Sequence, residues 1–166
     1  MEVPNIWRFA VIGPGRVGTA LTELLLRQGH RCIAVAGRTR IAAQTLAERV
    51  GATAWEASEL EGEGDVLFLT VRDDELCTLA EQLANPSRSL RFRLAVHTSG
   101  VHPADVLEPL RRYGTSLLSM HPAASITKHL EAWRLLRQAF FTLDGDERAM
   151  EEVAREIERW GGSWCQ

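Results

Sequence analysis

Three glycines near the start of the chain have the spacing of a phosphate-binding turn. The pattern G-x-G-x-x-G occupies residues 13 to 18, which are Gly13, Pro14, Gly15, Arg16, Val17 and Gly18. In such a turn the first glycine allows a sharp bend, the second lets the backbone approach a pyrophosphate, and the third lets a helix pack close to its strand. The alternative is a glycine-rich turn that binds no ligand.

The residues on either side of the turn favour the ligand-binding interpretation. The apolar run at residues 9–12 predicts a buried parallel strand that enters the turn directly. Val17, Leu21 and Leu25 then recur at helical spacing, so a helix should follow. A strand, this turn and a helix form the context that a dinucleotide-binding turn requires, with free N–H groups facing the phosphates.

The residues after the second predicted strand indicate which dinucleotide would bind. A site for NAD usually carries an Asp or Glu there, which accepts hydrogen bonds from the ribose hydroxyls. This chain has Gly37, Arg38, Thr39 and Arg40 at that place and no acid. The planar guanidinium of Arg38 suits a phosphate, and Thr39 adds a hydroxyl. We therefore predict that Arg38 and Thr39 bind the 2′-phosphate of NADP; the alternative is a solvated arginine at a turn.

Further candidates follow the later predicted strands. We expect Val71 and Arg72 to line the path of the cofactor ribose, although Arg72 is also explained as an ordinary exposed arginine. Ser99 is placed to reach a substrate or ribose hydroxyl, and its alternative role is to stabilise a turn. His121 carries an imidazole, which titrates near neutral pH and can act as acid, base or hydrogen-bond donor. Its alternative role is to hold its own loop.

Strands and helices alternate along the chain. Apolar runs predict strands near residues 8–12, 31–36, 52–55, 66–71, 94–97, 115–120 and 140–143, with another beginning after residue 160. Helical spacing predicts helices near residues 16–28, 41–50, 76–83, 103–113 and 146–160. We expect Asp73 or Asp74 to cap the third helix, and Ile41, Leu46 and Val50 to form the inner face of the second.

This alternation predicts an α/β protein with a doubly wound, mostly parallel sheet and helices on both faces, in three layers. The length of 166 residues suits one dinucleotide-binding domain over residues 1–166. In such sheets ligands bind beyond the carboxyl ends of the strands, at the point where the strand order reverses. All the candidate residues should therefore meet at one edge of the sheet.

Composition narrows the classes of function. Hydrophobic residues make up 45%, charged residues 25%, and the formal net charge is -3. These values favour neither a nucleic-acid partner nor a membrane surface. Cys32, Cys77 and Cys165 are odd in number and widely spaced, so we predict no disulfide framework, no metal motif and a reducing, cytoplasmic location. We expect no signal segment, since the start of the chain lacks a basic and then apolar pattern.

The other histidines are expected to be structural. His97 lies inside a predicted strand and should be a satisfied core residue. His102 precedes a proline and should belong to a helix cap. His30 and His129 are predicted at the surface.

Motifs in the second half of the chain resemble a known family. They are His-Thr-Ser-Gly at residues 97–100, the pair His121-Pro122 and Asp-Gly-Asp at residues 144–146. With the glycine turn, they resemble Rossmann-like proteins that carry a DUF2520 carboxy-terminal domain. These are similar to the 6-phosphogluconate dehydrogenase-like superfamily, which includes pyrroline-5-carboxylate reductases and F420-dependent NADP reductases. The similarity covers nearly the whole chain.

The resemblance implies an oxidoreductase that passes hydride between NADP(H) and a small carbonyl or imine substrate, whose identity is unknown. His121 resembles the histidine of a His-Pro turn in prephenate dehydrogenases, which meets the substrate hydroxyl beside the nicotinamide. The family's helical second domain, which helps to build the active site and the dimer, is not expected in this chain. A second copy could close the site instead, so we expect a homodimer. The alternative is a non-catalytic, dinucleotide-responsive regulatory or interaction module.

Overall fold

Eight strands form one sheet in a computed structural model that describes residues 3–128 and 130–166. The strands are β1 (Arg8–Ile12), β2 (Arg31–Gly37), β3 (Thr53–Glu56), β4 (Gly62–Leu69), β5 (Leu90–His97), β6 (Ser116–Pro122), β7 (Phe140–Gly145) and β8 (Ser163–Cys165). The helices are α1 (Arg16–Arg27), α2 (Arg40–Val50), α3 (Asp73–Leu83), α4 (Ala132–Arg137) and α5 (Glu147–Trp160), with 3-10 helices η1 (Ala57–Glu59) and η2 (Ala104–Tyr113). The order across the sheet is β3-β2-β1-β4-β5-β6-β7-β8.

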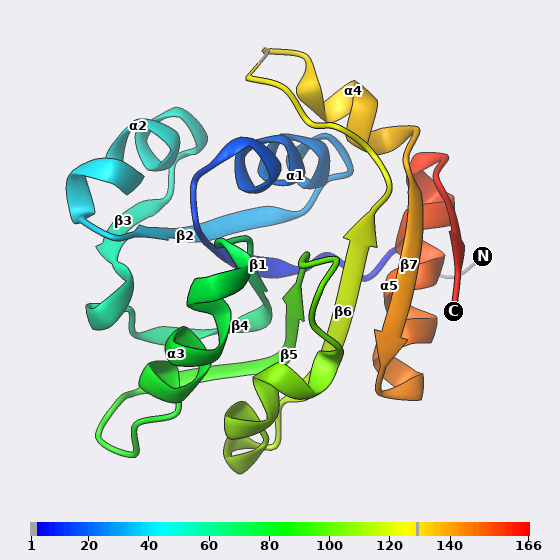
Figure 1. Ribbon diagram of the computed structural model, residues 1–166. Helices are drawn as coiled ribbons and strands as arrows, with labels where there is room; N and C mark the ends of the chain where they lie inside the picture. The colour runs from blue at the N-terminus through cyan, green and yellow to red at the C-terminus, as the bar shows by residue number, and fades with distance from the viewer. Residues whose placement is uncertain (1–2, 129) are drawn as a thin grey trace.

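Two apolar cores lie on the two faces of the sheet, and β1 contributes to both. Phe9 and Val11 belong to the core under α1, α2, α4 and α5, whereas Ala10 and Ile12 belong to the core under α3 and η2. Successive side chains of a strand point to opposite faces, so a strand covered on both sides is apolar throughout. Figure 1 shows α1 and α2 on one side of β1 and β2, and α3 on the other. The predicted three-layer, doubly wound α/β fold is confirmed.

The direction of the sheet reverses at β7. Strands β1 to β6 are parallel, whereas β7 runs antiparallel to β6 and β8 is parallel to β7. The connection after β6 forms α4, which packs on α1, where Arg27 covers the ring of Trp133 at 4.1 Å from its centroid. It then returns at the same edge, so that the Ala123 N–H donates to the Phe140 carbonyl at 2.8 Å. Because the connection does not cross to the other end of the sheet, β7 must run antiparallel to β6. The sequence does not predict α4.

Two strands begin earlier than predicted. β4 begins at Gly62 rather than near residue 66, and β5 begins at Leu90 rather than near residue 94. In the added part of β5, buried Leu90 and Phe92 alternate with exposed Arg91 and Arg93. In the added part of β4, the first two residues are exposed and the next two are half-buried. Both added segments meet solvent, so they lack the continuous apolar pattern of the buried halves.

Three helix predictions are corrected. Ile41 is 80% exposed, whereas the predicted inner position of Leu46 is confirmed and Val50 packs partly buried against the core. Ala43 and Ala47 complete the buried face of α2, and their small side chains let the helix lie close to the sheet. Neither Asp73 nor Asp74 caps α3; both lie in its first turn, where negative charge stabilises the positive end of the helix. The segment 104–113 is a 3-10 helix rather than an α-helix, and it contains Pro109, which has no N–H to donate.

The prediction of a surface position for His30 is wrong. Its imidazole is buried, and Nδ1 accepts a hydrogen bond from the Trp7 backbone N–H at 3.0 Å. The proton must therefore lie on Nε2, which donates to Glu156 at 2.8 Å. The Trp7 ring stacks on the imidazole, with centroids 4.6 Å apart. His30 thus anchors the segment before β1 to α5, whereas His129 lies outside the described residues.

A neighbouring ion pair joins β5 to the same helix. Arg93 donates two hydrogen bonds to Glu152, at 2.7 and 2.6 Å, and the Trp7 indole donates a third at 2.7 Å. Burial works to raise the pKa of Glu152, but the hydrogen bonds from Arg93 and Trp7 together outweigh it and hold the pKa below its ordinary value of 4.5.

Of the helices described, none is long and apolar enough to cross a membrane.

Acid should weaken the fold through Glu152. A carboxyl whose pKa is lower in the folded than in the unfolded chain stabilises the fold above its unfolded pKa, near 4.5, and this contribution is lost as the pH falls through the native pKa. We expect Glu152→Gln to reduce the free energy of unfolding at neutral pH by about 1–3 kcal/mol and to flatten its decline in acid. Urea denaturation as a function of pH measures both effects. The control is Glu151→Gln, at an exposed position of α5; equal pH profiles for wild type and Glu152→Gln would contradict the assignment.

Candidate functional site

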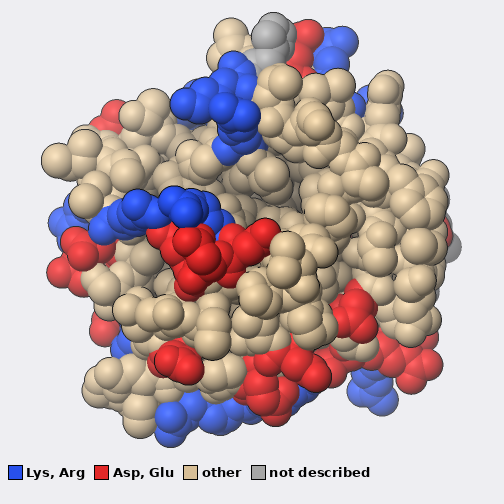
Figure 2. Space-filling view, in the orientation of Figure 1, with Lys and Arg blue, Asp and Glu red and all other residues tan. Residues whose placement is uncertain are grey.

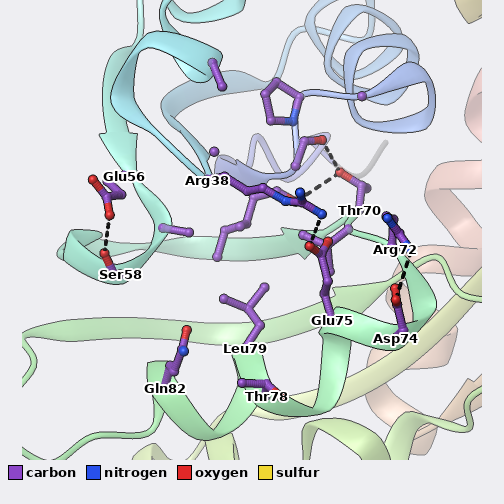
Figure 3. Close-up of a pocket in the computed structure, with 18 residues that line it drawn as sticks. Arg38, Glu56, Ser58, Thr70, Arg72, Asp74, Glu75, Thr78, Leu79 and Gln82 are labelled. Atoms are coloured by element: carbon purple, nitrogen blue, oxygen red, sulfur yellow. Dashed lines mark hydrogen bonds and ion pairs between the residues drawn. The ribbon is translucent and has the colours of Figure 1, made fainter.

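A cleft of about 690 Å³ opens at the carboxyl ends of the parallel strands. Its lining comes from the ends of β1, β2, β3 and β4, from residues of α2 and η1, and from one side of α3 (Figure 3). β1 and β4 are neighbours in the sheet, but the helices that follow them, α1 and α3, cover opposite faces. A crevice forms at this reversal of strand order, because the two chains leave the sheet in opposite directions. The cleft lies at the reversal of strand order, the position at which the sequence predicts a ligand site.

Gly13 and Gly18 are glycines because the backbone leaves them no room. Gly13 has φ +102°, its N–H donates to the Ala36 carbonyl at 2.9 Å, and a Cβ would lie 2.7 Å from the carbonyl oxygen of Thr70. A Cβ at Gly18 would lie 2.1 Å from the Gly13 carbonyl oxygen. These two glycines let the ends of β1, β2 and β4 and the start of α1 meet.

Gly15 differs from the other two glycines of the turn. Its φ is −82°, which any residue can adopt, and a Cβ there would have no other group of the described chain within 4 Å. It lines the cleft and precedes the first turn of α1, whose N–H groups have no side-chain cap from it. Neither the backbone nor the packing explains this glycine, whereas a ligand lying against the turn would.

The variable residues of the turn divide between the ligand side and the core. Pro14 lines the large cleft beside Gly15. Arg16 instead lines a second cleft of about 410 Å³, which shares Pro14 and Gly15 with the first. Val17 packs against the core on the α1 side of the sheet. The structure therefore brings Pro14, Gly15 and Arg16 to solvent-facing positions and assigns Val17 to packing.

Arg38 reaches the cleft from the end of β2, as predicted, and forms an ion pair there. Its guanidinium donates to the carboxylate of Glu75, which comes from the first turn of α3 (Figure 3). Thr39 has a different role, because its hydroxyl accepts the Ala42 N–H at 3.1 Å and caps α2. Lys and Arg side chains lie beside Asp and Glu side chains at the hollow on this face (Figure 2).

Val71 and Arg72 also line the cleft, as predicted. Val71 packs against the core on the α3 side, whereas the Arg72 side chain is 70% exposed and donates to Asp74 at 2.9 Å. Val71 therefore supplies an apolar wall. Arg72 is an exposed arginine beside the site, in agreement with the alternative considered for it.

His121 lies farther along the same edge, at the end of β6. Its Nδ1 is 3.3 Å from the Thr98 carbonyl oxygen, and since a carbonyl can only accept, Nδ1 carries the proton. Nε2 has no hydrogen-bond partner within residues 3–128 and 130–166. A Cβ at Gly100 would lie 2.6 Å from the imidazole Cε1, so the ring rests on that glycine. Among the described residues, the lining of the large cleft does not include His121.

Ser99 and His97 shape the turn under His121. The Ser99 hydroxyl is buried and accepts the N–H groups of Val101 and His102, at 3.1 and 3.3 Å. His97 is a core residue, as predicted: Nδ1 accepts the Ser99 N–H at 3.1 Å and Nε2 donates to the Pro103 carbonyl at 3.0 Å. Burial lowers the pKa of His97, so the neutral imidazole is favoured. These contacts describe the turn-stabilising role of Ser99 rather than the catalytic one.

Two residues that shape the cleft, Thr70 and Glu75, were not predicted from the sequence. Thr70 follows β4, and its hydroxyl donates to the Gly13 carbonyl at 2.8 Å. Its only sequence signal is a polar residue at the end of an apolar run. Glu75 is one of three acids in the first turn of α3, and its neighbours in the sequence do not distinguish it. In the described part of the chain, no group of three or more His, Cys, Asp and Glu residues is arranged to hold a metal ion.

The doubly wound sheet and the glycine turn at its reversal define the class of nucleotide-binding α/β domains found in dehydrogenases. The chain belongs to the Rossmann-like domain family, which matches residues 4–122. No curated protein matches the chain by sequence.

Solved structures share this fold over nearly the whole chain. A candidate NADP oxidoreductase from Bacteroides fragilis has a TM-score of 0.77 and 20% identity, over 96% of this chain and 60% of that protein. A protein from Thermotoga maritima has a TM-score of 0.70 and 26% identity, over 95% and 56%. 1-Pyrroline-5-carboxylate reductase from Streptococcus pyogenes has a TM-score of 0.67 and 16% identity, over 97% and 58%.

These matches confirm the predicted likeness to pyrroline-5-carboxylate reductases at the level of the fold, and they include a candidate NADP oxidoreductase. The likeness to F420-dependent NADP reductases stays a prediction. The DUF2520 assignment stays a prediction. In each comparison the chain spans between 56% and 60% of the length of the matched protein.

Valine at Gly15 should have little effect on stability, whereas valine at Gly18 should be strongly destabilising. At Gly15 the side chain enters open space, so we expect the free energy of unfolding to stay within about 1 kcal/mol of wild type. At Gly18 it would collide with the Gly13 carbonyl and push α1 from the sheet, which should cost more than about 3 kcal/mol. Urea denaturation of the two variants measures the difference. Equal destabilisation would show that Gly15 is a packing residue.

Proposed function

We propose that residues 1–166 form an NADP(H)-binding domain of an oxidoreductase. The observation that carries the proposal is the open space at Gly15, in a turn whose other two glycines are required by packing. Two features beside that space suit an anionic ligand, since the start of α1 offers backbone N–H groups and Arg38 offers a guanidinium. The cleft volume of about 690 Å³ is within the usual range for small-molecule sites.

The residues present fit a nicotinamide dinucleotide. Gly13 to Gly18 would hold the pyrophosphate, Val71 would lie against an apolar part of the cofactor, and Arg38 would take the 2′-phosphate. No Asp or Glu stands at the end of β2, where an NAD site usually has one. The fold neighbour from Bacteroides fragilis is described as a candidate NADP oxidoreductase, which agrees with this choice.

The proposed reaction is the reduction of a small carbonyl or imine compound, or its reverse. When bound, the cofactor would supply a hydride to the carbon of the C=O or C=N group, and a proton must then reach the oxygen or nitrogen. His121 is our candidate for that proton transfer, because its Nδ1–H is engaged by the Thr98 carbonyl and its Nε2 is available. In the oxidation direction Nε2 would accept the substrate proton, and in the reduction direction it would donate a proton that it has first taken up from solvent. Ser99 would act indirectly, by holding the turn on which the imidazole rests.

Three further features belong to the same proposal. We place the protein in the cytoplasm, since its three cysteines are free, as a reducing compartment would keep them. We propose a homodimer, in which a second copy helps to cover the strand ends. The substrate is a small molecule, with no nucleic-acid or membrane partner.

Arg38 should determine the preference for NADP(H) over NAD(H). A charge-assisted contact to phosphate contributes about 1.5–3 kcal/mol, so NADPH should bind about ten- to a hundredfold more tightly than NADH. Arg38→Gln should remove most of this preference and leave NADH affinity nearly unchanged. Isothermal titration calorimetry with both cofactors measures it.

The matched control is Arg31→Gln, which removes the same charge at the opposite end of β2. It should leave both affinities unchanged. If wild type binds NADPH and NADH equally tightly, NADP specificity is contradicted. If wild type binds neither cofactor, the proposed function of the domain is contradicted. Gly15→Val should abolish binding of both cofactors.

The isolated 166-residue chain should bind NADPH but consume it slowly. Hydride transfer needs a closed, dry site, and this chain spans about 60% of the length of its dehydrogenase-like neighbours. Steady-state NADPH oxidation with a panel of carbonyl and imine compounds is the measurement. The rate of any NADPH oxidation should fall at least about a hundredfold in His121→Ala, which is the scale expected for loss of an acid–base group. In the control variant His102→Ala the rate should persist. Tight binding without turnover in any variant would instead support the regulatory module.

A further inference from the structure

The guanidinium proposed to take the 2′-phosphate already holds an anion. Arg38 at the end of β2 is paired with Glu75 in the first turn of α3, so the pair links the two elements that flank the switch-point cleft. In Figure 3 the two side chains point toward each other across the cleft lining. Arg72 is likewise paired with Asp74, but that pair lies within one short segment.

Resting on the function proposed above, we infer that Glu75 competes with the 2′-phosphate for Arg38 and thereby reduces the preference for NADP(H) that Arg38 provides. Glu75 carries the negative charge that a phosphate would bring, at the same donor. The two anions cannot share one fork of N–H groups without repelling each other. Binding of a 2′-phosphate therefore requires the carboxylate to move away, whereas a ligand with a free 2′-hydroxyl leaves the pair intact.

The exposure of the pair makes this exchange possible. The Arg38 side chain is 71% exposed and that of Glu75 is 34% exposed. An ion pair in such contact with water changes an equilibrium by only about twofold to fivefold. A phosphate dianion forms stronger charge-assisted hydrogen bonds with arginine than a single carboxylate does, so it can displace Glu75. The carboxylate lowers the affinity for the phosphate without preventing its binding.

A different role for Glu75 would have the opposite consequence. If its carboxylate replaced the missing acid of β2 and accepted hydrogen bonds from ribose hydroxyls, it would favour NAD(H). Removing the charge would then weaken binding of a ligand with a free 2′-hydroxyl. If Glu75 competes for Arg38, removing it strengthens binding of the 2′-phosphorylated ligand alone.

The test uses two ligands that differ by one phosphate, adenosine 2′,5′-bisphosphate and adenosine 5′-monophosphate. Calorimetry should show that Glu75→Gln binds the bisphosphate about twofold to fivefold more tightly than wild type, with unchanged affinity for the monophosphate. Glu75→Ala, which also removes the acceptor atom, should give at least the same gain. The gain should shrink as salt is raised, because both groups are exposed.

The matched control is Asp74→Asn, one residue away in the same helical turn and paired with Arg72. It should change bisphosphate affinity by less than about twofold, since only general charge is altered. Circular dichroism confirms that each variant is folded. Two results would overturn the inference but leave NADP binding in place. One is an equal gain in bisphosphate affinity in Asp74→Asn. The other is no gain in either Glu75 variant, while Arg38→Gln still abolishes the preference for the bisphosphate. No preference for the bisphosphate in wild type and Glu75 variants overturns both the inference and NADP binding.

Discussion

The close approach of Gly13, Gly18 and Thr70 is the contact on which the strand-end edge depends. Thr70 donates its hydroxyl to the Gly13 carbonyl, and its backbone N–H donates to the Ile12 carbonyl at 2.9 Å. Gly13 in turn donates to the Ala36 carbonyl, so one turn connects the ends of three neighbouring strands. A side chain at either glycine would separate these elements. The cleft exists because the backbone closes tightly beneath it, and Gly15 remains the place where a ligand can touch the turn.

Charge at the cleft rim is arranged in pairs rather than as a positive surface. Three arginines at or near the rim are largely exposed, and each is paired with a carboxylate that neutralises its charge. The pairs are Arg38 with Glu75, Arg72 with Asp74, and Arg40 with Glu59. Such pairs add little to folding stability. For the Arg38–Glu75 pair the proposed effect is on recognition, because an incoming phosphate must exchange with a carboxylate rather than with water alone. The affinity for a phosphate then depends on the difference between the binding free energies of the phosphate and the carboxylate at the Arg38 guanidinium. A single substitution can alter that difference.

The strand ends provide two regions with different supports. The cleft around β1, β2 and β4 is built mainly from backbone and charged rim, whereas the end of β6 carries His121 on the turn ordered by Ser99 and His97. Neighbouring strands are about 4.8 Å apart, so β6 lies roughly 10 Å from β4, two positions along the sheet. An extended ligand, rather than a compact one, would be needed to reach both regions. The reversal at β7 and the packing of α4 on α1 shape the far side of this edge.

The sequence alone determined the strand–turn–helix at residues 8–27, the alternating α/β order and the edge at which the candidates meet, because these follow from local spacing and the handedness of parallel connections. Tertiary structure decided which polar groups meet. Buried His30 is hydrogen-bonded to Glu156, which lies 126 positions away in the sequence, and Arg38 meets Glu75 across 37 positions. No local pattern encodes such pairs. The direction of β7 was decided in the same way, since the packing of α4 on α1 kept the chain from crossing the sheet.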